Sequence, residues 1–178
     1  MKGIILSEFV EFLEDTVGPE QAQAIIDNSG VSSGGAYSRV GQYDYQELIQ
    51  LLTQAVTDTE HETSFLLQAF SDHLFGVFKR DYQVFFDGVS SAAQMLSQID
   101  NHIHVEVKKL YPDAELPKFE YQTDGKQFTL DYQSPRPLAA VAQALVNACI
   151  KYFGNREELV SCEIAEDQCA AKFVIQLI

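Results

Sequence analysis

Apolar residues in the first two-thirds of the chain recur at helical spacing. Between Lys2 and Val17 they fall three and four residues apart, and Gly18-Pro19 ends the run. The Gly- and Ser-rich segment 28–35 predicts a loop. The same helical periodicity predicts further helices over 21–28, 45–56, 61–78 and, as one continuous helix, 90–111.

The pattern changes after Pro112 and Pro117. From Phe119 to Tyr132 apolar positions alternate, and the interruption Thr123-Asp124-Gly125-Lys126 is a typical hairpin turn. A helix over 138–153 and strands over 159–164 and 172–177 complete the pattern. The order predicts an α+β fold in which one helix crosses an antiparallel sheet. We expect one domain, 1–178, with a helical part over about 1–111 and an α+β part over about 112–178.

The charge of the chain limits its partners. A formal net charge of −14, from 26 acidic and 12 basic residues, disfavours nucleic acid and anionic membrane surfaces. No apolar stretch reaches the ~20 residues that span a bilayer, and Glu8 interrupts the start before a signal-peptide core forms. Cys149, Cys162 and Cys169 are an odd number of cysteines, which fits reduced thiols. We therefore expect a cytoplasmic protein without disulfides.

Two histidines in the predicted helix 90–111 face different ways. At 3.6 residues per turn, His104 lies beside the apolar stripe and aligns with Asp100, Val107 and Tyr111, whereas His102 points to water. By itself His104 has an ordinary interpretation, as a half-buried histidine satisfied by a carbonyl group. A role as a metal ligand needs support from elsewhere in the chain.

That support comes from Tyr132, Ser134 and Arg136. On an extended strand their side chains project to one face, where two hydroxyls and a guanidinium can bind a pair of carboxylates. The alternative is a polar strand end, although Pro135 and Pro137 on either side of Arg136 make that less natural. Together with His104, the three residues could hold a haem by its iron and its propionates.

The chain resembles the haem-nitric oxide/oxygen binding (H-NOX) family, the haem domain of bacterial nitric oxide sensors, which is related to that of soluble guanylate cyclase. The resemblance covers essentially the whole chain. The matching residues are Met1-Lys2-Gly3-Ile4-Ile5, the segment 103–112 that includes His104, Pro117, and the signature Tyr132-x-Ser134-x-Arg136.

The resemblance implies haem b (protoporphyrin IX iron) bound between a helical N-terminal lobe and a C-terminal α+β lobe. It makes His104 the proximal iron ligand, Tyr132, Ser134 and Arg136 the propionate-binding residues, and Pro117 the residue that distorts the porphyrin. The resemblance also implies that Ile5, Phe9, Leu74, Phe78 and Val141 line the pocket. From the sequence pattern alone, the first four of these are ordinary core residues.

The residue at position 141 affects which gas the haem is expected to bind. In family members that bind dioxygen, a distal tyrosine from the helix after the signature donates a hydrogen bond to the bound gas, and here the matching residue is Val141. The resemblance thus implies a sensor of nitric oxide, which also binds carbon monoxide, with poor or no dioxygen binding. A tyrosine from elsewhere, such as Tyr37, Tyr43 or Tyr45, stays open as a donor.

We expect no enzyme activity of the chain itself. The resemblance implies a signal to a sensor histidine kinase of a two-component system, or to a diguanylate cyclase or phosphodiesterase of cyclic-di-GMP signalling. A monomer is expected because a partner interface must stay accessible. Some relatives bind zinc near the C-terminus, but Cys162 and Cys169 match only part of that pattern and predict no zinc site.

Two other classes of function remain as alternatives. A haem enzyme would need an acid or base near the iron, and the expected distal residues offer none. A haem-free α+β protein-interaction module would use His104 and the Tyr132-x-Ser134-x-Arg136 signature only for packing and surface chemistry.

Overall fold

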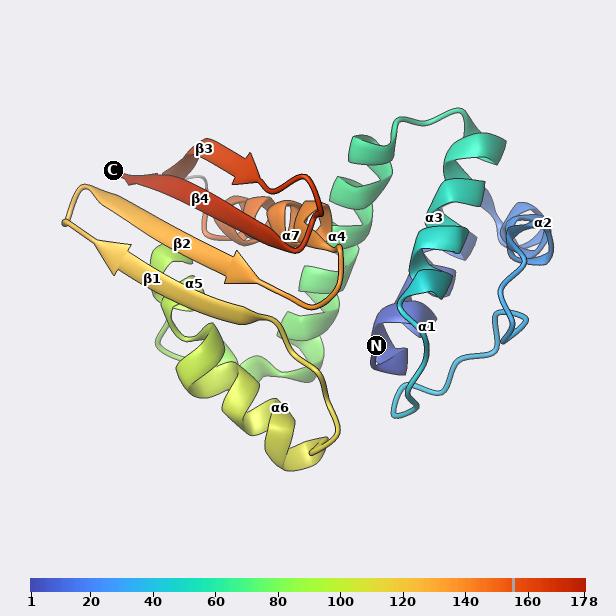
Figure 1. Ribbon diagram of the computed structural model, residues 1–178, viewed down its shortest axis with the longest axis horizontal. Coiled ribbons are helices and arrows are strands. Elements are labelled where there is room, and N and C mark those ends of the chain that lie inside the picture. Colours follow the sequence, from blue (N-terminus) through green and yellow to red (C-terminus); the bar gives the residue numbers. More distant parts are fainter. Residues whose placement is uncertain (155) are drawn as a thin grey trace. The chain divides into compact units, whose positions relative to one another are not determined.

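The computed structural model describes residues 1–154 and 156–178. Internal contacts group the chain into two compact units, Met1–Leu74 and Phe75–Ile178, and the division falls inside helix α4 (Thr63–Asp81) (Figure 1). The later helices thus belong to the same unit as the sheet. That the chain acts as a single domain remains a prediction.

The first unit is helical, as the apolar spacing predicted. Fully buried side chains from its helices form the core, and within it Phe9 and Phe70 pack edge to face with ring centroids 4.8 Å apart. Gly18, with φ of 86°, separates the first two helices. The helices of this unit are α1 (Gly3–Val17), α2 (Pro19–Ser29), α3 (Gln46–Thr59) and the first part of α4.

Gly3 begins α1 where the backbone of the loop before α3 comes very close. Its N–H donates to the carbonyl oxygen of Gly41 at 2.9 Å. A Cβ at this position would overlap the Ser38 carbonyl oxygen and the ring of Tyr43. Only glycine fits without a shift of that loop.

The second unit contains one antiparallel sheet, with α7 (Ala139–Tyr152) packed on one face (Figure 1). The strand order is β1-β2-β4-β3, so β2 and β4 are central. The Asp124-Gly125 hairpin and the crossing helix are as predicted, and the α+β class is confirmed. The strands are β1 (Lys118–Thr123), β2 (Gln127–Gln133), β3 (Glu157–Ile164) and β4 (Ala170–Leu177).

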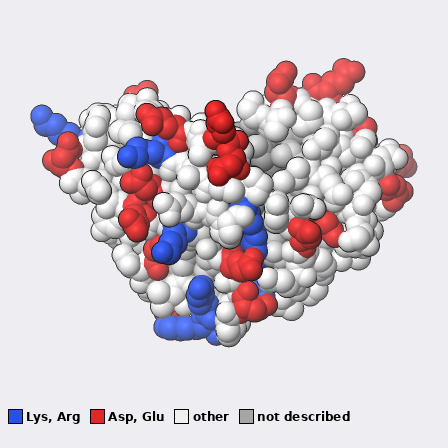
Figure 2. Space-filling view, viewed as in Figure 1, with Lys and Arg blue, Asp and Glu red and all other residues white. Residues whose placement is uncertain are grey.

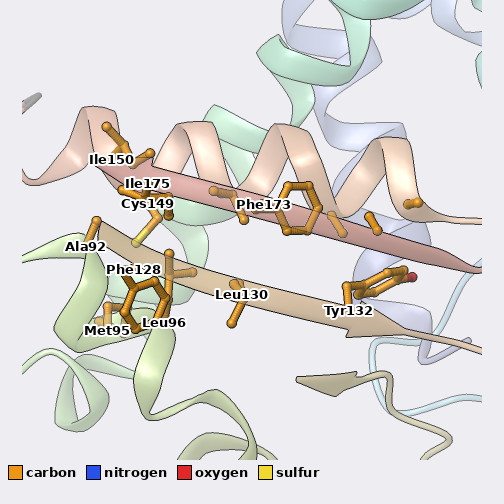
Figure 3. Close-up of a cluster of buried hydrophobic side chains, with 14 residues drawn as sticks. Ala92, Met95, Leu96, Phe128, Leu130, Tyr132, Cys149, Ile150, Phe173 and Ile175 are labelled. Atoms are coloured by element: carbon orange, nitrogen blue, oxygen red, sulfur yellow. The ribbon is translucent and has the colours of Figure 1, made fainter. Parts of the chain in front are cut away.

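Alternate residues of β2 point toward α7. Phe128, Leu130 and Tyr132 are each at most 3% exposed and meet Phe173 and Ile175 of β4. Figure 3 shows this row, with Tyr132 at its far end, where β2 leaves the core. The hydrophobic core thus fixes the position of one residue of the predicted signature.

The predicted helix 90–111 is not continuous. It consists of α5 (Ala92–Ser97), a π-helical turn (Ile99–Ile103) and α6 (His104–Leu110). In the π turn, the N–H of His104 binds the carbonyl of Ile99, five residues earlier. The apolar spacing did not reveal the extra residue, and Leu110, predicted on the inner stripe, is 66% exposed.

The start of α5 is held by a buried carboxylate from another part of the chain. Glu157, which is 6% exposed, accepts hydrogen bonds from the N–H groups of Ala92 at 2.8 Å and Ala93 at 3.0 Å. These are two of the donors that a helix leaves without partners at its N-terminus. β3 thereby anchors the segment that leads to His104.

A short 3₁₀ helix, Gln83–Phe85, lies between α4 and α5.

Within the described part of the chain, no helix has both the length and the apolar character needed to cross a membrane.

Candidate functional site

His104 is the first residue of α6, and its side chain is 17% exposed. Nδ1 lies 2.8 Å from Oδ1 of Asp100, so it donates its proton to the carboxylate and leaves Nε2 for another partner. Burial lowers the pKa of His104 below 6.5, although the Asp100 carboxylate opposes the effect. The neutral imidazole that results is the form that binds metals.

Asp100 is a functional candidate that the sequence reasoning did not assign. Its second oxygen, Oδ2, accepts the backbone N–H of Phe119 at 3.0 Å. One carboxylate thus connects the imidazole of His104 to the first strand of the sheet. Its position four residues before His104 was a usable signal, whereas the contact with Phe119 was not visible in the sequence.

The signature residues come together in a different way from the one predicted. β2 ends at Gln133, so Tyr132, Ser134 and Arg136 do not alternate along one strand. Instead the chain bends at Pro135, and the Ser134 hydroxyl accepts the backbone N–H of Arg136 at 3.0 Å. Burial raises the pKa of the Tyr132 phenol, and the Ser134 side chain opposes this effect. The three residues therefore lie close together because of a turn, and not because they share one strand.

Arg136 is the cation of this cluster, and its side chain is only 14% exposed. Its Nη2 forms an ion pair with Oε2 of Glu115, and its Nη1 donates to the backbone carbonyl of the same residue at 3.3 Å. The site therefore includes a residue from the connection between α6 and β1 that the sequence did not indicate.

An aromatic residue joins the two parts of the site. The ring of Phe119 lies 5.9 Å from the imidazole of His104 and 5.4 Å from the ring of Tyr132, measured between centroids. Both distances are in the range of favourable aromatic pairs. Within the second unit, the ring of Phe119 therefore lies between the candidate iron ligand His104 and the candidate propionate-binding residue Tyr132.

The other predicted site residues are buried or half-buried within their own units. Pro117 is half-buried and directly precedes β1, and Val141 is half-buried in the first turn of α7. Phe78 is half-buried in the last turns of α4. In the first unit Ile5 is half-buried, while Phe9 and Leu74 are each 1% exposed. Their roles toward a haem remain proposals.

Two tyrosines that sequence left open as donors have local partners. The hydroxyl of Tyr37 donates to Oε2 of Glu47 at 2.6 Å, and burial, followed by this bond, raises the pKa of Tyr37. The hydroxyl of Tyr43 accepts the backbone N–H of Ser38 at 2.8 Å. The proton of the Tyr37 hydroxyl is thus committed within the first unit, whereas the Tyr43 hydroxyl is the acceptor in its contact.

The donor set of the second unit fits a haem better than a simple metal ion. Among the residues that the structure describes, no group of three or more His, Cys, Asp or Glu side chains could hold a metal. A porphyrin supplies four nitrogens itself and needs one protein ligand, which Nε2 of His104 can be. Tyr132, Ser134 and Arg136 offer the donors that two propionates require.

Comparisons with known proteins agree with this chemistry. The family model of haem-NO-binding proteins matches residues 2–160. The unliganded Fe(II) H-NOX protein from K. algicida has 36% identity and a TM-score of 0.88, with 99% of this chain and 96% of that chain covered. The Fe(II)CO form of the H-NOX from Shewanella woodyi has 31% identity and a TM-score of 0.82, with coverages of 100% and 95%.

A more distant H-NOX protein, from S. oneidensis in the Fe(II)NO state, shares the fold at 22% identity, with a TM-score of 0.82 and coverages of 100% and 99%. No curated protein shows significant similarity to the chain. The family match covers most of the sequence and includes every residue of the candidate site. The chain therefore belongs to the haem-NO-binding family, the H-NOX haem gas-sensor domains.

Proposed function

We propose that this protein is a cytoplasmic sensor that binds nitric oxide at ferrous haem b, with poor or no dioxygen binding, and signals to another protein. The observation that carries the proposal is the pairing of His104 with Asp100, which places the imidazole proton on Nδ1 and leaves Nε2 for the iron, while burial favours the neutral imidazole. The Tyr132-Ser134-Arg136 cluster lies on the other side of Phe119.

Each residue of the site has a distinct task in this proposal. When bound, the haem supplies the ferrous iron to which the gas attaches. His104 would hold that iron, while Tyr132, Ser134 and Arg136 would hold the propionates, and Pro117 would press on the porphyrin. For Ile5, Phe9, Leu74 and Phe78, contact with the haem or gas is a proposal drawn from the family.

The gas selectivity rests on Val141. Its side chain has no hydrogen-bond donor, and the hydroxyl of Tyr37 already donates its proton to Glu47. Bound dioxygen carries partial negative charge and depends on a nearby donor, whereas nitric oxide and carbon monoxide depend on one much less. These features support nitric oxide and carbon monoxide as ligands.

A route for the signal starts at the same histidine. Asp100 holds Nδ1 of His104 with one oxygen and the N–H of Phe119 with the other. A displacement of the imidazole would therefore pull on the carboxylate and, through it, on the start of β1. Such a shift between two arrangements is what a partner protein can detect.

The partner we propose is a sensor histidine kinase, or a diguanylate cyclase or phosphodiesterase. The net charge of −14 favours a basic docking surface on that partner. Figure 2 shows acidic side chains spread over the face it draws, with no broad basic patch. We propose that the sensor is a monomer before it binds this partner.

The test is the visible absorption spectrum of the purified, dithionite-reduced protein, recorded under inert gas, then in air, then with nitric oxide. We expect a five-coordinate high-spin spectrum that air leaves unchanged and nitric oxide shifts. A stable dioxygen complex would contradict the selectivity. A protein that contains no haem and does not take up added haem would favour an interaction module instead.

A further inference from the structure

The guanidinium of Arg136 makes two contacts with a single residue outside the signature. Nη2 pairs with the carboxylate of Glu115, and Nη1 donates to the backbone carbonyl of Glu115 at 3.3 Å. Glu115 lies two residues before Pro117, in the connection between α6 and β1. The contact therefore joins the segment that carries Pro117 to the segment that carries the signature.

The segment of Arg136 is itself fixed on its other side. The N–H of Ser134 donates to the carbonyl of Cys169 at 2.8 Å, and the N–H of Ala139 donates to Gln168 at 3.0 Å. Residues 134–139 are thus attached to the turn between β3 and β4. Against this fixed backbone, the long side chain of Arg136 still needs a partner to hold its planar end in one orientation.

From these contacts we propose that Glu115 is a positioning residue. It holds the Arg136 guanidinium in the orientation that receives a propionate, and it holds the Pro117 segment against the same group. The inference rests on the proposed role of Arg136 in haem binding. A guanidinium has five N–H donors, and the two contacts with Glu115 leave donors for a propionate.

The opposite role for Glu115 is that of a competitor. Its carboxylate would then occupy the guanidinium and would have to leave before a propionate binds. The backbone carbonyl argues for positioning, because it is not displaced when a side chain swings away. The exposed fractions also favour positioning, since the Arg136 side chain that is held is only 14% exposed, whereas the Glu115 side chain that holds it is 65% exposed.

The two roles predict opposite changes in the rate at which haem leaves the protein. We would measure transfer of ferric haem from the holoprotein to excess apomyoglobin. As a positioning residue, Glu115→Gln should speed haem loss roughly 2- to 5-fold, as expected for a partly exposed ion pair. Slower haem loss would show a competitor and overturn the inference.

The matched control is Glu120→Gln, which removes the same charge from an exposed position on β1. It should leave the rate unchanged, and an equal effect would reduce the role of Glu115 to general electrostatics. In an Arg136→Ala background, Glu115→Gln should have no further effect. A full additional effect there would overturn the inference.

A second readout does not depend on the rate of haem loss. Propionate-bending bands in the resonance Raman spectrum of the reduced holoprotein should shift in Glu115→Gln and in Arg136→Lys, but not in Glu120→Gln. If Arg136→Ala speeds haem loss while Glu115→Gln changes neither rate nor bands, only this inference fails. If Arg136→Ala itself has no effect, the propionate site of the proposed function fails.

Discussion

The imidazole Nδ1 of His104 lies 2.8 Å from Oδ1 of Asp100, four residues earlier in the chain. Asp100 lies within the π-helical turn Ile99–Ile103, which ends directly before His104, and it also holds the backbone of Phe119. Because the carboxylate fixes which imidazole nitrogen carries the proton, it also fixes the direction from which Nε2 can bind a metal.

Removing the carboxylate should weaken haem binding. In Asp100→Asn the charged partner of His104 is lost, and we expect haem loss to become roughly 10- to 100-fold faster, the usual effect of such partners. The Fe–His stretching band of the reduced protein should move to lower frequency. Asn101→Ala, at the neighbouring exposed position, is the control. Identical behaviour of the two variants would argue against a role for Asp100.

Removing the imidazole should abolish the protein ligand to iron. His104→Gly is expected to lose the five-coordinate ferrous spectrum, and added imidazole should restore it. His102→Ala is the matched control, because His102 is exposed on the same turn. If His104→Gly kept the wild-type spectrum, His73 would be the next candidate ligand. The structure shows His73 Nε2 3.0 Å from Oε2 of Glu8.

A hydroxyl donor at position 141 should confer dioxygen binding. We expect Val141→Tyr to stabilise bound dioxygen by about 1–3 kcal/mol, the value of a buried hydrogen bond to a charged acceptor. Spectra in air would report it. Val141→Phe adds the ring without the hydroxyl and should not bind dioxygen. Equal dioxygen binding by both variants would mean that ring size, and not the donor, determines selectivity.

Two glycines should respond oppositely to alanine. In Gly3→Ala the new Cβ meets the Ser38 carbonyl oxygen and the Tyr43 ring, and we expect a loss of about 1–3 kcal/mol in the free energy of unfolding. Gly76→Ala, inside α4 with open space around it, should gain roughly 0.5–1 kcal/mol. Urea unfolding of the haem-loaded variants measures both, and equal changes would contradict the close approach at Gly3.

The acid limit of stability should depend on Glu47. Burial raises the pKa of this carboxyl, but hydrogen bonds from Ser33, Tyr37 and Ser32 outweigh burial and lower it below 4.5. A lowered folded-state pKa stabilises the protein above the unfolded-state value, and this contribution disappears as the pH falls through the folded-state pKa. Urea unfolding from pH 7 to about 3 should therefore be less pH-dependent in Glu47→Gln.

The control for this effect is Glu11→Gln, an exposed position on α1. It should reproduce the wild-type pH profile of the free energy of unfolding. A Glu47→Gln profile as steep as that of the wild type would mean that other carboxyl groups set the acid limit.

Local patterns predicted the parts of this fold that depend on local chemistry. The Asp124-Gly125 turn and the alternation of Phe128, Leu130 and Tyr132 predicted the hairpin and its buried face, and both are observed. Helical spacing also placed His104 inward and His102 outward, and His104 is half-buried while His102 is exposed.

What escaped prediction depends on contacts between residues far apart in sequence, or on small changes in backbone pairing. Glu115 and Arg136 are 21 residues apart, and Asp100 and Phe119 are 19 apart, so no periodicity joins them. The end of β2 at Gln133 moved the signature from a strand into a turn. The apolar spacing over 90–111 is that of a regular α-helix, so the pattern did not indicate the π-helical turn.

The π-helical turn Ile99–Ile103 gives the helix before β1 one residue more than α-helical pairing would use. The extra residue would allow this segment to change its hydrogen-bond pairing. If the turn reverted to α-helical pairing, α6 would advance by one residue, which corresponds to a screw motion of about 100° and about 1.5 Å. The exposed side chains of Val105 and Leu110 would then rotate about the helix axis by the same angle.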